Sequence, residues 1–199
     1  SYAVTGTVND ANWQGTNVGT LVIGKAIAAV TLDDLAHVYD GTAKSATATT
    51  VPAGLAVDFT YAGSATAPSN AGSYAVTGTV NEANWQGAAT GTIVIGKAFA
   101  TVTLGSLAQT YSGAACAATA TTMPAGLTVE FTYDGSPTAP TAAGSYAVTG
   151  TVNEANWLGL STGTLTIGKG PATVFLGDLA QTYDGTARTI SATTLPAGL

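Results

Sequence analysis

The sequence predicts an all-β protein built from tandem modules, each a small antiparallel β-sandwich. The motif Ser-Tyr-Ala-Val-Thr-Gly-Thr-Val begins at Ser1, Ser73 and Ser145, so the chain repeats every 72 residues. Only 8% of the residues are charged and 46% are hydrophobic, with many Thr and Val, a composition that favours strands over disorder. A repeat of this length is long enough to form its own modest core.

Gly-Lys pairs that start at Gly24, Gly96 and Gly168 set the predicted boundaries. Residues 25–96 and 97–168 are expected to be complete repeats, residues 1–24 the C-terminal part of one repeat, and residues 169–199 the N-terminal part of another. Because the sequence starts and stops inside a repeat, the natural ends, with any signal or anchor, are expected outside it. No apolar stretch approaches the roughly 20 residues of a membrane helix.

The first half of the repeat is read as three short extended segments. Residues 100–104, like 28–32 and 172–176, form a run of β-formers and predict the first strand. A second extended piece ends at the turn Tyr111-Ser-Gly113. A third, residues 118–122, is closed by Met123-Pro-Ala-Gly126, whose Pro and Gly favour a tight turn.

The second half contains the clearest strand, residues 127–133, in which apolar and polar side chains alternate. Asp134-Gly-Ser136 predicts a turn, and residues 137–140 predict a loop or edge because Pro137 and Pro140 cannot donate ladder hydrogen bonds. Residues 144–152 predict the partner strand, in which Tyr146, Val148 and Val152 stand at every second position with a gap at Gly150.

Asn153-Glu-Ala-Asn-Trp157 predicts a single helical turn, and residues 163–167 predict the last strand. We expect Trp157, like Trp13 and Trp85, to plug one end of the core. About six strands per unit favour an immunoglobulin-like sandwich, in which Tyr146 has the position of a corner tyrosine. A β-grasp sheet that uses residues 153–157 as a vestigial helix is the alternative.

Charge and cysteine content exclude some functions. The net charge is −6 with a pI near 4.3, and the five basic residues are scattered, so nucleic acid is not an expected partner. Cys116 is the single cysteine, so it cannot form a disulfide within its module.

Several motifs together resemble one family, the MBG/YDG-type repeats of large bacterial surface and secreted proteins. They are Thr110-Tyr-Ser-Gly113, Pro124-Ala-Gly-Leu127, Tyr133-Asp-Gly-Ser136, Ala143-Gly-Ser-Tyr146 and Asn153-Glu-Ala-Asn-Trp157. The resemblance runs the whole length and implies an extracellular or cell-surface, adhesin-like protein with many tandem copies. It implies no catalytic residues, and Trp157 departs from the Tyr that many such repeats carry.

The residues themselves do not predict an enzyme. His37 is the only histidine, and its counterparts are Gln109 and Gln181, so one repeat cannot assemble a catalytic triad. We therefore expect no catalytic residues, no cofactor-binding residues and no cofactor.

Calcium is the better chemical candidate, because carboxylates in turns can bind it at module junctions. The carboxylates concerned are Asp33, Asp34, Asp40, Asp178 and Asp184. The middle repeat has Gly105, Ser106 and Ser112 at the corresponding positions, so at most an occasional Ca²⁺ site is expected, and no metal-binding residue is assigned.

Two further possibilities concern cross-linking and adhesion. Lys97, Glu154 and either Asn153 or Asn156 are the components of an intramolecular Lys–Asn isopeptide bond, with Asp10 in place of the Glu in the first partial repeat. That reaction would require burial of the three groups in an apolar core. Trp85 and Trp157 could stack on a sugar ring, although a core role is the simpler interpretation.

The function that these features favour is structural, a semi-rigid stalk or fibre of a bacterial surface or secreted protein. Short junctions such as residues 95–98 restrict rotation between neighbouring repeats, which are the expected partners. The main alternative is a self-assembling extracellular filament of identical chains, since the two end segments together lack only the counterpart of residues 128–144. A carbohydrate- or protein-binding adhesion module is the third possibility.

Overall fold

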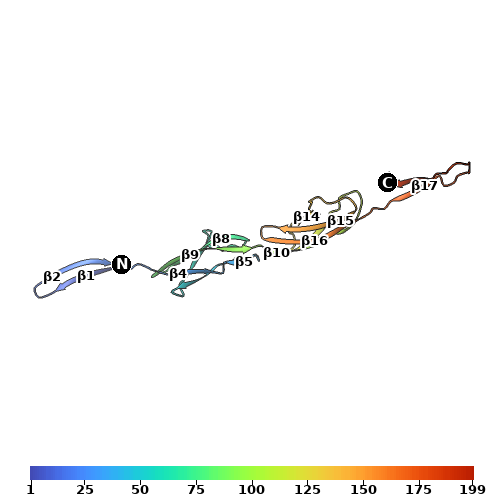
Figure 1. Ribbon diagram of the computed structural model, residues 1–199. Coiled ribbons are helices and arrows are strands. Elements are labelled where there is room, and N and C mark those ends of the chain that lie inside the picture. Colours follow the sequence, from blue (N-terminus) through green and yellow to red (C-terminus); the bar gives the residue numbers. More distant parts are fainter. The chain divides into compact units, whose positions relative to one another are not determined.

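The computed structural model describes residues 1–199. Its only regular secondary structure is β-strand, and it has no helix (Figure 1). The chain divides into two compact units, residues 1–98 and residues 99–199. The first unit contains an N-terminal hairpin, β1 (Tyr2–Asn9) and β2 (Gln14–Leu21), followed by the first module. The strands of the first module are β3 (Ala26–Ile27), β4 (Ala29–Asp33), β5 (Ala36–Val38), β6 (Thr47–Val51), β7 (Asp58–Tyr61), β8 (Gly72–Asn81) and β9 (Trp85–Gly96).

The second unit repeats this arrangement in the opposite order, with a module followed by a hairpin. The strands of the second module are β10 (Ala98–Phe99), β11 (Thr101–Gly105), β12 (Ala108–Thr110), β13 (Thr119–Met123), β14 (Glu130–Tyr133), β15 (Gly144–Asn153) and β16 (Trp157–Gly168). The C-terminal hairpin consists of β17 (Thr173–Gly177) and β18 (Ser191–Leu195). None of the chain forms a helix of the length and apolarity needed to cross a membrane.

Each module has a large mixed sheet and a small antiparallel one, which confirms the all-β prediction. The large sheets have the orders β3-β9-β8-β7 and β10-β16-β15-β14, and the small sheets are β4-β6 and β11-β13. The long hairpin of the second module pairs from Gly144↔Ile167 to Asn153↔Leu158. Strands β5 and β12 lie parallel to β9 and β16, respectively, a feature that the sequence did not reveal.

The core of each module lies between the two sheets. In the first module, Val76 and Ile93 are fully buried, and Leu32 and Leu35 pack against them. The second module has the equivalent cluster, with Val148 and Leu165 at its centre. Alternation along β8 and β15 therefore sends every second side chain inward, as the period-2 pattern predicts.

Two glycines let a leucine approach the hairpin of each module closely. A Cβ on Gly78 would lie 2.9 Å from Leu32 Cδ2, and a Cβ on Gly91 would lie 3.1 Å from Leu32 Cδ1. Leu104 packs in the same way over Gly150 and Gly163. The two glycines form a notch that the leucine fills.

The predicted corner tyrosine is present in both modules. Tyr146 donates its hydroxyl hydrogen to the carbonyl oxygen of Ala142 at 3.0 Å, and Tyr74 does the same to Asn70. A bond from the start of a strand to the backbone a few residues upstream is a feature of immunoglobulin-like sandwiches. The structure has no helix to cover a β-grasp sheet, so the sandwich interpretation agrees better with it.

The prediction of a helical turn at residues 153–157 was wrong. Strand β15 ends at Asn153 and β16 starts at Trp157, and Glu154 N donates to Trp157 O at 3.0 Å, so the segment is a hairpin turn. The prediction that tryptophan plugs the core was also wrong. Trp85 and Trp157 are only half-buried, and Trp13 is 76% exposed, because each stands at the hairpin turn, away from the buried cluster.

Two strands start at other residues than the sequence predicts. The strand expected over residues 127–133 pairs only from Glu130, because the backbone N–H groups of Leu127 and Thr128 donate to the side chains of Thr122 and Glu154. The last strand is longer than predicted, since hairpin pairing extends it back to Trp157.

Candidate functional site

The most strongly interacting charged group of the first module is Asp40, in the turn after β5. Its Oδ1 accepts hydrogen bonds from Thr42 N at 2.9 Å and from Thr42 Oγ1 at 2.6 Å, and its Oδ2 accepts one from Lys44 Nζ at 2.5 Å. In the last repeat, Asp184 forms the same bonds to Thr186 and a 2.7 Å ion pair with Arg188. In the middle repeat, Ser112 and Cys116 replace both members of the pair together. The two aspartates therefore stabilise a turn.

The pKa of Asp40 is held well below its ordinary value, first by the hydrogen bond from Lys44 and then by those from Thr42. The pKa of Asp184 is also lowered, but Thr186 is the main cause and Arg188 contributes less. Because a depressed carboxyl pKa stabilises the fold above the unfolded-state pKa, this stabilisation is lost as the pH falls through the folded value.

This difference in cause gives a prediction. Lys44→Met is expected to raise the pKa of Asp40 toward its ordinary value, and Arg188→Met is expected to raise that of Asp184 by a smaller amount. Carboxyl-detected NMR titration of the two single variants and the parent chain measures both pKa values. Equal shifts in the two variants, or none at Asp40, would contradict this assignment of causes.

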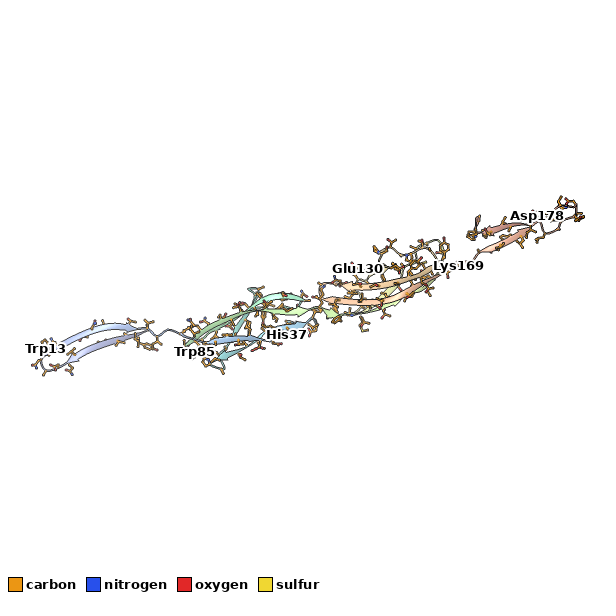
Figure 2. The ribbon with its side chains drawn as sticks, in the orientation of Figure 1. Trp13, His37, Trp85, Glu130, Lys169 and Asp178 are labelled. Atoms are coloured by element: carbon orange, nitrogen blue, oxygen red, sulfur yellow. The ribbon has the colours of Figure 1, made fainter.

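His37, labelled in Figure 2, contacts the backbone of the loop that precedes β5. Its Nε2 lies 2.9 Å from the carbonyl oxygen of Asp34, which can only accept a hydrogen bond. Gln109 and Gln181 donate from Nε2 to the equivalent carbonyl oxygens, those of Ser106 and Asp178, at 2.8 Å. A histidine in the place of two glutamines therefore makes the same structural contact.

The other candidate carboxylates are explained by backbone conformation. Asp34, Ser106 and Asp178 all have positive φ, near 55°, where short polar residues are favoured over most others. Asp33 is exposed at the end of β4. No three His, Cys, Asp or Glu side chains in the chain gather into a cluster that could hold a metal ion.

The structure brings together two components of the hypothetical isopeptide bond. Lys25 Nζ donates a hydrogen bond to Asn81 Oδ1 at 2.5 Å, and these residues are the counterparts of Lys97 and Asn153. Both residues are exposed, and the carboxylate of Glu82 accepts a hydrogen bond from Ala56 N at 2.7 Å. The pair lacks the apolar burial that amide formation requires, so we interpret the contact as a hydrogen bond.

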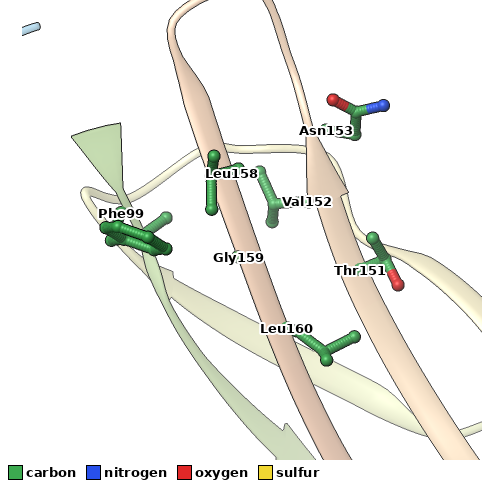
Figure 3. A pocket seen from close by; sticks show the side chains of 8 residues that line it. Phe99, Thr151, Val152, Asn153, Leu158, Gly159 and Leu160 are labelled. Atoms are coloured by element: carbon green, nitrogen blue, oxygen red, sulfur yellow. The ribbon is translucent and has the colours of Figure 1, made fainter. Parts of the chain in front are cut away.

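A shallow apolar depression of about 470 Å³ lies on the second module, beside the hairpin of β15 and β16 (Figure 3). Phe99, Leu158 and Leu160 are its largest apolar side chains. The first module has Gln86 and Ala88 in place of the two leucines. The two leucines that line the depression are therefore particular to the second module.

Protein-family models place the repeat in a known group. The model described as MBG domain matches residues 1–27, 28–99, 100–171 and 172–199, which together cover the whole chain. The chain belongs to the MBG domain family. The matched ranges start 72 residues apart in the interior of the chain, in agreement with the repeat spacing. No curated protein is similar enough to this chain to count as a relative.

Both complete MBG modules contain two hydrogen bonds that sequence reasoning missed. Glu154 Oε1 accepts from Thr128 N at 2.6 Å, as Glu82 does from Ala56 N, and this contact holds the loop before β14 and β7. The buried Tyr133 hydroxyl accepts from Ala118 N at 2.9 Å. Recurrence of Glu and Tyr at the repeat spacing was the available signal, but it could not identify their distant partners.

Cys116 is buried in the core cluster of the second MBG module, with its Sγ 3.8 Å from the carbonyl oxygen of Ala114. It is a free cysteine. Its burial replaces the ion pair of the neighbouring repeat by an apolar contact.

Proposed function

We propose that this chain is a structural segment of an extracellular, adhesin-like bacterial surface or secreted protein, where its MBG domains form a stalk or fibre. The observation that carries the proposal is that the polar side chains bind groups within their own turns and modules. Asp40, Asp184 and His37 bind groups of their own turns, and Glu82 and Glu154 hold loops of their own modules. Residues so engaged serve the stability of their own modules.

The connections between modules support the same proposal. Only Lys97 separates β9 from β10. A one-residue connection leaves few rotatable bonds, so neighbouring repeats, proposed as residues 25–96 and 97–168, are expected to act as semi-rigid partners. The net charge of −6 makes nucleic acid an unfavourable partner.

Cell-surface labelling tests the location. An antibody raised against residues 25–168 is expected to label intact cells of the source organism, or to detect the protein in the culture medium. Protease added to intact cells should remove the label. A signal that requires permeabilised cells would contradict the proposal.

A subunit of an extracellular filament is the second candidate function. It rests on the same tandem MBG repeats as the stalk proposal. The apolar depression beside Phe99 offers few polar groups to orient a sugar, so a carbohydrate-binding role has less support.

A further inference from the structure

An apolar patch lies on the outer face of the large sheet of the second module. It consists of Phe99 on β10 and of Leu158 and Leu160 on β16 (Figure 3). Phe99 is 81% exposed and Leu160 is 66% exposed. Single exposed apolar side chains are ordinary on a protein surface, whereas several that lie together mark interaction sites more often.

The patch borders the shallow depression described above. Val152 and Gly159, which pair across β15 and β16, also line it. The side chain of Val152 is 1% exposed and lies in the core, and Gly159 has none, so these two residues present mainly their backbone to the depression. Side chains alternate along a strand, so the neighbours of Gly159, Leu158 and Leu160, flank this backbone on the outer face.

The fold does not require these two leucines. The hairpin of the first module has the same register and carries Gln86 and Ala88 at the corresponding positions. A polar residue and a small residue therefore fit the same backbone. Because Leu160 is mostly exposed, it contributes little to the packing of its own module.

The one charged side chain on β14, β15 and β16 lies beside the patch. It is Glu130, which is exposed and belongs to none of the ion pairs of the chain. Glu130 pairs with Thr151 on the next strand, and Thr151 pairs with Leu160. Residues that pair directly share a face of the sheet, so Glu130 and Leu160 lie on the outer face about 10 Å apart, two strand spacings.

Charge and polarity together select the class of partner. A second copy of this chain carries the same net charge of −6, and membrane surfaces carry anionic lipids, so electrostatic repulsion opposes both. A sugar needs more polar groups to orient it than Thr151 and Asn153 supply. A protein segment that carries a large apolar side chain and a basic one complements both the patch and Glu130.

We infer that the second module binds a positively charged protein segment through this patch. A large apolar side chain of the partner enters the depression beside Leu158 and Leu160 and packs against Phe99, while a Lys or Arg of the partner pairs with Glu130. The site goes beyond the stalk function, which requires no ligand. A failure of this inference therefore leaves the stalk proposal intact, and cell-surface labelling tests that proposal separately.

Selection from a random peptide library displayed on phage is the first test, with the whole 199-residue chain immobilised. We expect the recovered peptides to share a large apolar residue with a Lys or Arg a few positions away. No enrichment over a surface without the chain, or enrichment of peptides that lack a basic residue, would overturn the inference.

The decisive variant combines Leu158→Gln with Leu160→Ala, which gives the second module the residues of the first. The first module holds those residues in the same register, so the variant is expected to fold. Fluorescence anisotropy with a recovered peptide should show an affinity about tenfold or more below that of the parent chain, because the apolar anchor contacts are lost. The matched control is Thr164→Ala, farther along the same face of β16, which should bind like the parent. Equal affinities of the double variant and the parent would overturn the inference.

Glu130→Gln tests the charged part of the contact. Peptide binding to the parent chain should weaken as the salt concentration rises, because salt screens an exposed ion pair. The variant should bind more weakly than the parent at low salt and should depend less on salt. A salt dependence equal to that of the parent would contradict the role of Glu130.

Two measurements test the other occupants with the same Leu158→Gln, Leu160→Ala variant. Sedimentation velocity detects association of the chain with itself, and pelleting with phosphatidylglycerol vesicles detects lipid binding. We expect neither for the parent chain. Self-association or vesicle binding that the double variant abolishes would mean that the patch serves a second copy or a membrane, and would overturn the inferred partner.

Discussion

Replacing Ile93 by alanine is expected to destabilise the first MBG module by about 3–4 kcal/mol. Ile93 is fully buried on β9, in a cluster with Val76 and Tyr61, so truncation removes buried apolar surface and leaves a cavity. Urea unfolding followed by Trp85 fluorescence measures the change, in a chain whose Trp13 and Trp157 are replaced by phenylalanine.

Val94→Ala is the matched control for this prediction. Val94 is adjacent on the same strand but is 45% exposed on the other face of the sheet. Its truncation should cost less than about 1 kcal/mol, in line with substitutions outside a core. Similar losses for the two variants would mean that the core of the module does not lie on the Ile93 side of the sheet.

Replacing Gly87 by alanine is expected to destabilise the first module by about 2 kcal/mol. A Cβ at this position would lie 2.3 Å from the carbonyl oxygen of Ala28, so the backbone at the start of β4 would have to move. The movement would disturb the hydrogen bond from Ala28 N to Gln86 O and the short parallel pairing of β3 with β9. The same unfolding measurement records the loss.

The matched control is Gly15→Ala, at the corresponding position of the N-terminal hairpin. A Cβ on Gly15 would meet only Val8 Cγ2, at 3.9 Å, which is ordinary contact. This variant should leave the unfolding of the first module unchanged. If Gly87→Ala also had no effect, the close approach of the Ala28 carbonyl oxygen to Gly87 would be contradicted.

The sequence was sufficient to predict the all-β class, the repeat spacing and most strand positions. Period-2 alternation identified the inward side chains of β8 and β15 because a strand with one buried face imposes it. The corner tyrosine was also predictable, since Tyr146 follows a short Ala-Gly-Ser turn at the start of a strand. These features depend on neighbouring residues, which is why a single sequence reveals them.

The features that the sequence did not predict depend on partners far along the chain. Strands β5 and β12 are too short to show a pattern, and their parallel pairing with β9 and β16 follows from the packed module. Glu154 reaches Thr128 across 26 residues, and this contact ends the pairing of β14 early. The polar residues 153–157 resembled a capped turn because short polar segments are compatible with both a helix start and a hairpin.

The sequence predicted the turns in which the polar groups lie but not the residues that they contact. Asp40 and Asp184 were correctly placed in turns, but their pairing with Lys44 and Arg188 became evident only from the fold. In the middle repeat, Ser112 and Cys116 replace the carboxylate and the cation together, so neither charged group is present without the other.

The contour length of polypeptides with different repeat numbers tests the central claim of a structural stalk or fibre most directly. Electron microscopy of otherwise identical chains with two, four and eight complete repeats, with and without a calcium chelator, provides the measurement. We expect extended particles whose length increases by a constant amount per repeat and does not change on chelation. Compact particles whose length does not follow repeat number, or collapse on chelation, would contradict the proposed function.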